Sequence, residues 1–366
     1  MLSLDPFAAA LATGEDALRA AETVGKELAR SGSQGTLGFV YVTDKLKADF
    51  SAIVECLREH TGVEHWVGTI GFGVIAGRGA VFDKPAIAAM ICTWPKDQLD
   101  FYDHLSPPPP ADEKAFGMPT AIVHVDPRNR QFDTLLRSIA TRSGAYLVGG
   151  ITASRTNHFD QVASRPAEGG LSGVLLSPDI PVSIGVTQGC SPVGPARTIT
   201  ATQENLVLKL DEDAPLQALL KDLAATEESD LRRVLESLHV ALPVANCDTG
   251  DYVVRNIIGI DTSNGCIAIA DNIEPGQKMF FCQRDRTAAT KDLSVMAEKL
   301  RRRTDQVHGA LYISCCARGP HLFESAEEEI ALLQTALGNV PLVGFYANGE
   351  IAGDRIYGYT GVLALF

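Results

Sequence analysis

The chain has fewer basic than acidic residues and lacks the cysteine and histidine spacings of common metal sites. Its 32 Lys and Arg residues stand against 45 Asp and Glu residues, for a formal net charge of -13. Nucleic-acid binding needs a basic surface, so we expect no nucleic-acid partner, and we interpret the basic run at residues 301–303 as a solvated helix end. No C-x-x-C, H-x-x-x-H or H-E-x-x-H pattern occurs, so we expect no metal site. The eight cysteines mostly lie in apolar runs, which is typical of buried free thiols in a reducing compartment.

Long apolar runs are also missing. No stretch approaches the roughly 18 apolar residues of a membrane span, and the apolar residues 7–12 are too few for a signal peptide. We therefore expect a cytoplasmic protein without a membrane span. A length of 366 residues with 45% hydrophobic residues favours two domains. We place them at residues 30–200 and 201–366, because a Gly- and Pro-rich stretch at residues 191–195 precedes the boundary.

Three stretches of the chain repeat one plan of strand, helix, strand and final strand. In the first two repeats the helix carries apolar residues at i, i+3, i+4 and i+7, the stripe of a helix that packs on a sheet. The first strand precedes the second by 25, 23 and 30 residues, which fits a helical crossover between parallel strands. Ser325 followed by Glu328 predicts a capping box at the start of the third helix, which we expect to end at Gly338. The predicted elements are 38–42, 50–57, 66–71 and 86–91; 121–125, 132–139, 146–151 and 171–176; and 310–313, 325–337, 342–345 and 360–365.

A glycine recurs in the second strand of each repeat, at Gly68, Gly149 and Gly344. Glycine lets the backbone approach a neighbour closely. The neighbour can be another part of the protein or a ligand, and the sequence leaves both interpretations open.

The segment between the second and third repeats has a different pattern. Residues 184–189 indicate a strand and a turn, and residues 213–238 indicate two helices. Three strands follow at 252–261, 266–271 and 278–283, and the turns Asn264-Gly265 and Pro275-Gly276 predict an antiparallel meander. A helix around residues 293–300 follows them, whereas residues 94–119 with four consecutive prolines indicate a surface loop. The predicted fold is α/β (mixed α+β), with repeated strand–helix–strand units in mixed sheets flanked by helices and a meander in the C-terminal half.

Polar residues follow two of the strands in the third repeat. Cys315, Arg318 and Gly319 follow one strand, and Asn348 and Glu350 follow the next. Polar groups at strand ends commonly line a pocket in an open α/β sheet. Arg318 suits a carboxylate and Glu350 an ammonium group, so together they would suit a zwitterion such as an amino acid. The alternative is that these two charges pair with each other, and Asn348 either binds the ligand or serves the turn.

Cys315 has three interpretations: a pocket wall, a redox sensor or a nucleophile. A nucleophile needs a nearby base, and His321 is close in sequence only. We favour a buried thiol in the pocket wall and therefore assign no catalytic residue.

The motifs around residues 255–261, 315–319 and 344–351, with Thr360, resemble the FIST sensory family, whose N-terminal and C-terminal FIST domains occur together. Looser matches lie at residues 67–69, 148–151 and 185–194. Ala317 replaces a common glycine, and the asparagine often found before Thr360 is missing. The resemblance adds Arg255 to the ligand-binding residues expected above.

The resemblance implies a ligand-binding input domain in signal transduction, with amino acids or other small metabolites as ligands. It also implies a separate signalling partner such as a kinase or a cyclase, because no such module is attached. Some family members bind haem and sense nitric oxide, so a haem-based gas sensor is one alternative. A cysteine-dependent enzyme using Cys315 is the other, and we expect a non-catalytic sensor without a cofactor.

Overall fold

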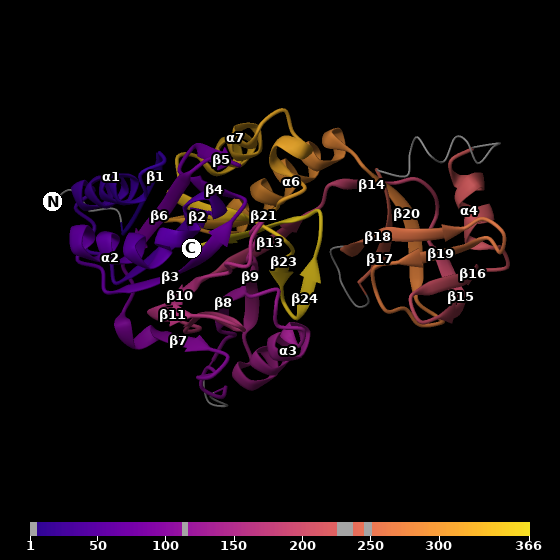
Figure 1. The fold of residues 1–366 in the computed structure, drawn as a ribbon, viewed down its shortest axis with the longest axis horizontal. Coiled ribbons are helices and arrows are strands. Elements are labelled where there is room, and N and C mark those ends of the chain that lie inside the picture. The colour runs from indigo at the N-terminus through magenta and orange to yellow at the C-terminus, as the bar shows by residue number, and fades with distance from the viewer. Residues whose placement is uncertain (1–5, 112–115, 225–236, 245–250) are drawn as a thin grey trace. The chain divides into compact units, whose positions relative to one another are not determined.

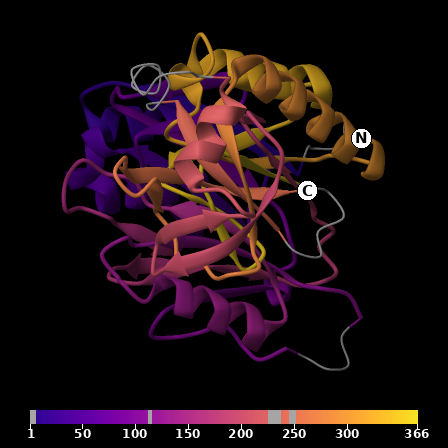
Figure 2. The same ribbon diagram turned by 90° about the vertical axis from the view of Figure 1, so that its right-hand side faces the viewer.

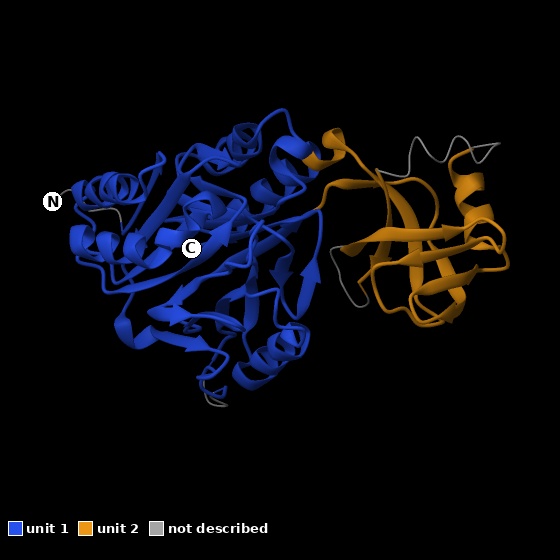
Figure 3. Ribbon diagram, in the orientation of Figure 1, with its two compact units in different colours: residues 1–187, 290–366 blue, residues 188–289 orange. Residues whose placement is uncertain are grey.

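The computed structural model describes residues 6–111, 116–224, 237–244 and 251–366. They form a mixed α/β fold, as predicted, in two compact units (Figures 1 and 3): residues 1–187 with 290–366, and residues 188–289. The predicted boundary after residue 200 lies within the strand β15 (Arg197–Gln203) of unit 2. The compact units therefore do not follow that boundary, and the two sequence domains remain a prediction.

All three predicted repeats are present in unit 1. In each one the first two strands are parallel, and the final strand pairs antiparallel with the first. The helix of each repeat provides the crossover that parallel strands require. The elements are β2 (Leu37–Thr43), α2 (Phe50–Thr61), β3 (His65–Gly71) and β6 (Ala86–Cys92); β8 (Thr120–Val125), α3 (Phe132–Ser143), β9 (Tyr146–Ile151) and β12 (Leu171–Leu176); and β21 (Ala310–Cys315), α7 (Ala326–Leu337), β22 (Leu342–Ala347) and β25 (Gly361–Leu365).

An additional edge strand extends each repeat. β1 (Phe7–Thr13) pairs with β6, β7 (Leu99–Asp103) with β12, and β13 (Ser183–Thr187) with β25. There are two further helices: α1 (Ala17–Arg30) follows β1 in the chain, and α6 (Arg286–Arg303) precedes β21. Residues 94–119 were thus wrongly predicted as one loop, because β7 lies within them after the short 3-10 helix η2 (Lys96–Gln98).

Each repeat donates a short hairpin to the sheet of another repeat. The hairpin of the first repeat extends the sheet of the third, that of the second extends the sheet of the first, and that of the third extends the sheet of the second. The three sheets are interlocked, and none is complete without a neighbouring repeat. The hairpins are β4 (Gly73–Ala76) with β5 (Gly79–Phe82), β10 (Gln161–Ala163) with β11 (Arg165–Ala167), and β23 (Glu350–Ala352) with β24 (Arg355–Tyr357).

The recurring glycines serve backbone packing. A Cβ atom at Gly68, Gly149 or Gly344 would lie 1.7, 1.8 or 1.7 Å from a carbonyl oxygen of the adjacent parallel strand. No side chain fits at such a distance. The sequence left two interpretations open, and the geometry supports close approach to another part of the protein.

The helices cover the outer faces of the three sheets with the predicted apolar stripes. Phe50, Ile53, Val54 and Leu57 of α2 are all buried and pack with α1 against the first sheet. Helices α6 and α7 lie on one face of the third sheet, where Figure 2 shows them in orange and yellow. The Ser325 side chain accepts the Glu328 backbone N–H at 3.2 Å, and α7 is followed by Gly338 with φ 85°, so both predicted ends of this helix are confirmed.

Unit 2 is a six-stranded antiparallel barrel with one added strand. The predicted strands at 252–261, 266–271 and 278–283 exist, and β17, β18 and β19 form an antiparallel meander in which β18 and β19 are paired as predicted. The third predicted strand differs, because β20 pairs with β17 and β15 instead of β19. Leu238, predicted in a helix, begins β17, and residues 225–236 of that prediction lie outside the described residues. The elements are β14 (Cys190–Pro192), β15, β16 (Leu206–Leu210), α4 (Pro215–Asp222), β17 (Leu238–Pro243), β18 (Tyr252–Asp261), β19 (Cys266–Ile269) and β20 (Lys278–Arg284).

Candidate functional site

The ends of β21 and β22 bring the predicted polar residues to one edge of the third sheet. Cys315 ends β21 opposite Ala347, which ends β22, and the Cys316 backbone N–H donates to the Ala347 carbonyl at 2.8 Å. The chain then turns through Gly349, at φ 129°, and enters β23 at Glu350 in the sheet of the second repeat. Glu350 therefore lies where two sheets meet. We call Cys315, Cys316, Glu350, Thr360 and Arg155 the strand-end cluster.

Glu350 is the buried acid of the strand-end cluster. One carboxyl oxygen, Oε2, accepts the Thr360 backbone N–H at 3.2 Å and the Thr360 hydroxyl at 2.7 Å. The other oxygen, Oε1, is buried without a hydrogen-bond partner among the described residues. Burial, with a further contribution from Cys315, raises the pKa of Glu350 well above its ordinary value. Burial thus favours the neutral, protonated form of Glu350, and one of its polar atoms is unsatisfied.

The two adjacent cysteines differ in exposure and acidity. The Cys315 residue is 6% exposed, whereas Cys316 is half-buried. A hydrogen bond between the two thiols, together with burial, raises the pKa of Cys315 well above its ordinary value. The same hydrogen bond lowers the pKa of Cys316, and the positive charge of Arg155 acts in the same direction. Cys315 is therefore a buried thiol that acts as donor, as expected of a pocket wall, and Cys316 is the more acidic and more accessible thiol.

Arg155 supplies the positive charge at the rim of the cluster. Its Nη1 lies 3.0 and 3.1 Å from the carboxylate oxygens of Asp44, and its Nη2 lies 3.1 Å from Asp83. The guanidinium also lies over the ring of Phe72, 4.6 Å from the centroid. The Arg155 side chain remains 42% exposed, so it can meet a ligand from solvent. Asp44 follows β2 at the start of the 3-10 helix η1 (Asp44–Asp49), so the first two repeats together position this guanidinium.

Arg318 lies on the other face of the third sheet. Successive residues of a strand alternate between faces, and Ser314 points to Glu329 of α7 whereas Cys315 belongs to the strand-end cluster. Arg318 is fully buried on the α7 side, where its Nε donates to Glu329 at 2.8 Å. Arg318 and Glu350 therefore neither pair with each other nor face one site. Arg318 pairs with Glu329, and its Nη1 and Nη2 atoms are buried without a hydrogen-bond partner among the described residues. A zwitterion site formed by Arg318 and Glu350 stays a prediction.

Glu329 organises the polar contacts under α7. It accepts the Tyr312 hydroxyl at 2.8 Å, the Ser314 hydroxyl at 3.0 Å and the Gly319 backbone N–H at 3.2 Å, in addition to Arg318. Gly319, another predicted ligand residue, has φ 49° and begins the 3-10 helix η3 (Gly319–His321). Arg318 and Gly319 thus belong to a buried structural network. Asn348, by contrast, is exposed beside Gly349, and its backbone N–H donates to Ile151 at 3.0 Å.

Sequence comparisons identify relatives for most of the chain. Residues 36–213 match the FIST N domain, and residues 215–353 match the FIST C domain. An uncharacterised protein of Mycobacterium bovis is 30% identical over 319 residues, covering 82% of each chain. An uncharacterised protein of Mycobacterium tuberculosis is 27% identical over 318 residues, covering 82% of this chain and 83% of the relative.

The chain belongs to the FIST family.

This FIST sensory-domain protein carries Arg255 in unit 2, on β18. The Arg255 Nε donates to Asp271 at 2.7 Å, beside an open depression lined by Glu204, Asn205, Ile258, Ile269, Ala270, Asp271 and Asn272. Arg255 is therefore already engaged with a carboxylate. Its role in ligand binding remains a prediction from the resemblance.

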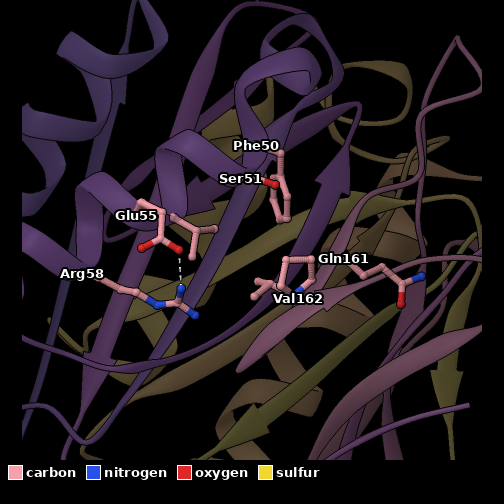
Figure 4. Close-up of a pocket in the computed structure, with 8 residues that line it drawn as sticks. Phe50, Ser51, Glu55, Arg58, Gln161 and Val162 are labelled. Carbon is pink, nitrogen blue, oxygen red and sulfur yellow. Dashed lines mark hydrogen bonds and ion pairs between the residues drawn. The ribbon is translucent and has the colours of Figure 1, made fainter. Parts of the chain in front are cut away.

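A further pocket of the FIST protein lies between α2 and the β10–β11 hairpin (Figure 4). It is lined by Phe50, Ser51, Val54, Glu55, Arg58, Gln161, Val162 and Pro166. The Arg58 guanidinium is paired with Glu55 and also donates to the Glu64 and Ser164 carbonyls at 2.9 and 2.6 Å. With these partners in place, the charges of the pocket are satisfied within the protein.

Haem, which some FIST proteins bind, does not fit the residues of these two pockets. Haem iron needs an axial ligand such as histidine, cysteine or methionine, and neither lining contains one. The buried His124 bonds Tyr41 at 3.1 Å through Nε2 and packs against the rings of Tyr41 and Phe345, and burial lowers its pKa to about 3. We therefore derive no step through haem. In the described part of the chain, no three metal-ligating side chains gather, and no helix has the length and apolar content to cross a membrane.

Most residues of the strand-end cluster were missed from the sequence. The sequence analysis did not predict a role for Cys316 or Arg155, and Arg155 lies in a loop without a motif. Glu329 had a readable signal, because it shares the buried helix face of Ala326, Ile330 and Leu333. A carboxylate on an apolar stripe predicts a buried partner, and Arg318 is that partner.

Proposed function

We propose that this FIST protein is a sensor that binds a small metabolite, an amino acid or a similar zwitterion, at the strand-end cluster. Glu350 would bind the ammonium group of the ligand, as the sequence suggested. Arg155 would bind the carboxylate, the role that the sequence suggested for Arg318. Binding would be passed to a separate signalling protein such as a kinase or a cyclase.

The unsatisfied Oε1 of Glu350 carries this proposal. Burying a polar atom without a hydrogen bond costs on the order of 1–3 kcal/mol. A ligand ammonium group would satisfy Oε1 and favour the ionised carboxylate, because an opposite charge stabilises the charged form. Burial favours the neutral form of Glu350, and the ligand would convert this carboxyl group to one half of an ion pair.

Arg155 supports the other half of the recognition. Its guanidinium is partly exposed and its positive charge acts on Cys316, and a planar guanidinium can bind a carboxylate through two hydrogen bonds. Asp44 and Asp83 hold it in place in the empty protein. A ligand carboxylate would share the outer edge of this guanidinium, whereas Arg318 is fully buried beside Glu329.

A thermal-shift screen with amino acids and small organic acids tests the proposal. A true ligand at 100 times its Kd should stabilise the protein by about 2.7 kcal/mol, which raises the melting temperature. Glu350→Gln should fold and lose this response, because the amide keeps the shape but cannot become an anion. Glu55→Gln, in the pocket beside α2, is the matched control and should respond like the native chain. No response in the native chain, or an equal response in Glu350→Gln, would overturn the proposal.

A further inference from the structure

A serine and a histidine meet where the hairpin of the second repeat joins the first sheet. The Ser164 hydroxyl lies 2.8 Å from the Nδ1 atom of His65, the residue that begins β3. Ser164 follows β10, and its backbone N–H donates to the Trp66 carbonyl at 2.7 Å. The two side chains come from different repeats, so the exchange of hairpins creates this contact. A hydroxyl within hydrogen-bond reach of an imidazole is the first requirement for a serine nucleophile.

Two further contacts hold the imidazole of His65. Its ring stacks on Phe101, with the centroids 4.8 Å apart, and its Nε2 atom lies 3.7 Å from a carboxylate oxygen of Glu64. A carboxylate beside Nε2 favours the tautomer that carries its proton there, which leaves Nδ1 free to accept the proton of Ser164. The His65 side chain is 25% exposed, so a reactant can reach it from solvent. A hydroxyl, a base and a carboxylate that orients the base therefore follow one another, as acyl transfer requires.

The backbone of Ser164 is fixed in an unusual conformation. Its φ is 63°, in the left-handed region that residues other than glycine seldom adopt. Its carbonyl accepts a hydrogen bond from the Arg58 guanidinium at 2.6 Å, so the N–H and the C=O of Ser164 are both bound. Residues in strained conformations are concentrated at active sites, where the strain helps to orient a reacting side chain. The geometry of the main chain thus supports the same role for Ser164 as its contact with His65.

We propose that Ser164 and His65 hydrolyse small carboxylic esters, with Ser164 as the nucleophile and His65 as the general base. The Ser164 oxygen attacks the carbonyl carbon of the ester while its proton passes to Nδ1 of His65. His65 gives this proton to the departing alcohol as the ester C–O bond breaks, which leaves an acyl group on Ser164. Water, deprotonated by His65 in the same way, releases the carboxylic acid and restores the serine. Glu64 acts through His65 and is a positioning residue.

Covalent labelling tests the proposal. The full-length protein is incubated with a fluorophosphonate, which loses fluoride to an activated serine, and the labelled residue is identified by mass spectrometry. Label should appear on Ser164 and be lost in Ser164→Gly, which should fold because glycine adopts a φ of 63° without strain. Ser154 is the matched control: it is also half-buried, but it contacts the Thr156 hydroxyl at 3.0 Å and should stay unlabelled. An unlabelled Ser164 in the native chain, or equal label on Ser154 and Ser164, would overturn the proposal.

Hydrolysis of p-nitrophenyl acetate gives a second measurement. His65→Gln should lower kcat and the rate of labelling at least about a hundredfold, because a general base contributes roughly 10²–10⁴-fold. Glu64→Gln should lower kcat with little change in KM, a division that a merely structural role would not produce. A His65→Gln variant as reactive as the native chain would remove the base and with it the proposal. The thermal-shift screen does not involve Ser164, so metabolite binding and ester hydrolysis can each fail while the other stands.

Discussion

Replacing Glu329 by glutamine should destabilise unit 1 far more than the same change at Glu350. Glu329 is fully buried and accepts hydrogen bonds from Tyr312, Ser314, Arg318 and Gly319. Glutamine would leave the Arg318 guanidinium as a buried charge without a counter-ion, and breaking a buried pair in this way costs roughly 3–5 kcal/mol. At Glu350 glutamine leaves no buried charge unpaired, so it should not destabilise unit 1.

Equilibrium unfolding in urea, followed by tryptophan fluorescence, measures the difference. Both tryptophans, Trp66 and Trp94, belong to unit 1, so the signal reports on that unit. The variants should differ in their unfolding midpoints with similar slopes, because the exposed surface is the same. Equal losses at Glu329→Gln and Glu350→Gln would refute the reasoning, since only Glu329 is paired with a buried arginine.

Three further measurements follow from the structure. Burial raises the folded-state pKa of Glu350, so above the ordinary glutamate pKa of 4.5 the unfolded chain loses a proton that the folded chain keeps. The native chain should therefore lose up to about 1.4 kcal/mol of stability per pH unit relative to Glu350→Gln, and parallel pH profiles would contradict this. Ser325→Ala should cost α7 about 1 kcal/mol through loss of its cap, seen as a lower urea midpoint, and an unchanged midpoint would show that the cap adds nothing. Gly344→Ala should cost at least about 3 kcal/mol, because its Cβ would lie 1.7 Å from the Tyr312 carbonyl oxygen, whereas the control Gly259→Ala meets only an ordinary contact at 3.7 Å.

The repeats could be predicted because their signals are local. The apolar stripes of α2 and α7 and the cap at Ser325 depend on residues a few positions apart, and all three appear in the structure. The exchanged hairpins could not be predicted in this way. Strands β10, β11, β23 and β24 have three residues each, too few for a periodic pattern. Of these four strands, β10 and β23 pair with strands of another repeat. Their partners are set by the way the three repeats pack.

The candidate site shows the same division. The sequence correctly suggested that polar residues gather where β21 and β22 end, since Cys315 and Glu350 do meet there. It paired the wrong charges, because alternation along β21 sends Ser314 and Cys315 to opposite faces, and Arg318 follows the face that α7 covers. Arg155 could not be foreseen, since its place depends on a loop of the second repeat reaching Asp44 of the first.

The interlocked repeats explain why an ionisable group occurs at only one of three equivalent positions. Each exchanged hairpin has one residue, at or near its start, that pairs with the residue after a recurring glycine. The three pairs are Val74 with Phe345, Gln161 with Thr69, and Glu350 with Gly150. Val74 is apolar, and the Gln161 Oε1 accepts the Ser172 hydroxyl at 2.7 Å, so these two positions hold no charge. Of these three residues, only Glu350 is ionisable. It lies between the sheet that it joins and the sheet of Thr360 and Cys315. A ligand that ionises Glu350 would therefore act on two repeats at once, while the two equivalent hairpins keep the fold unchanged.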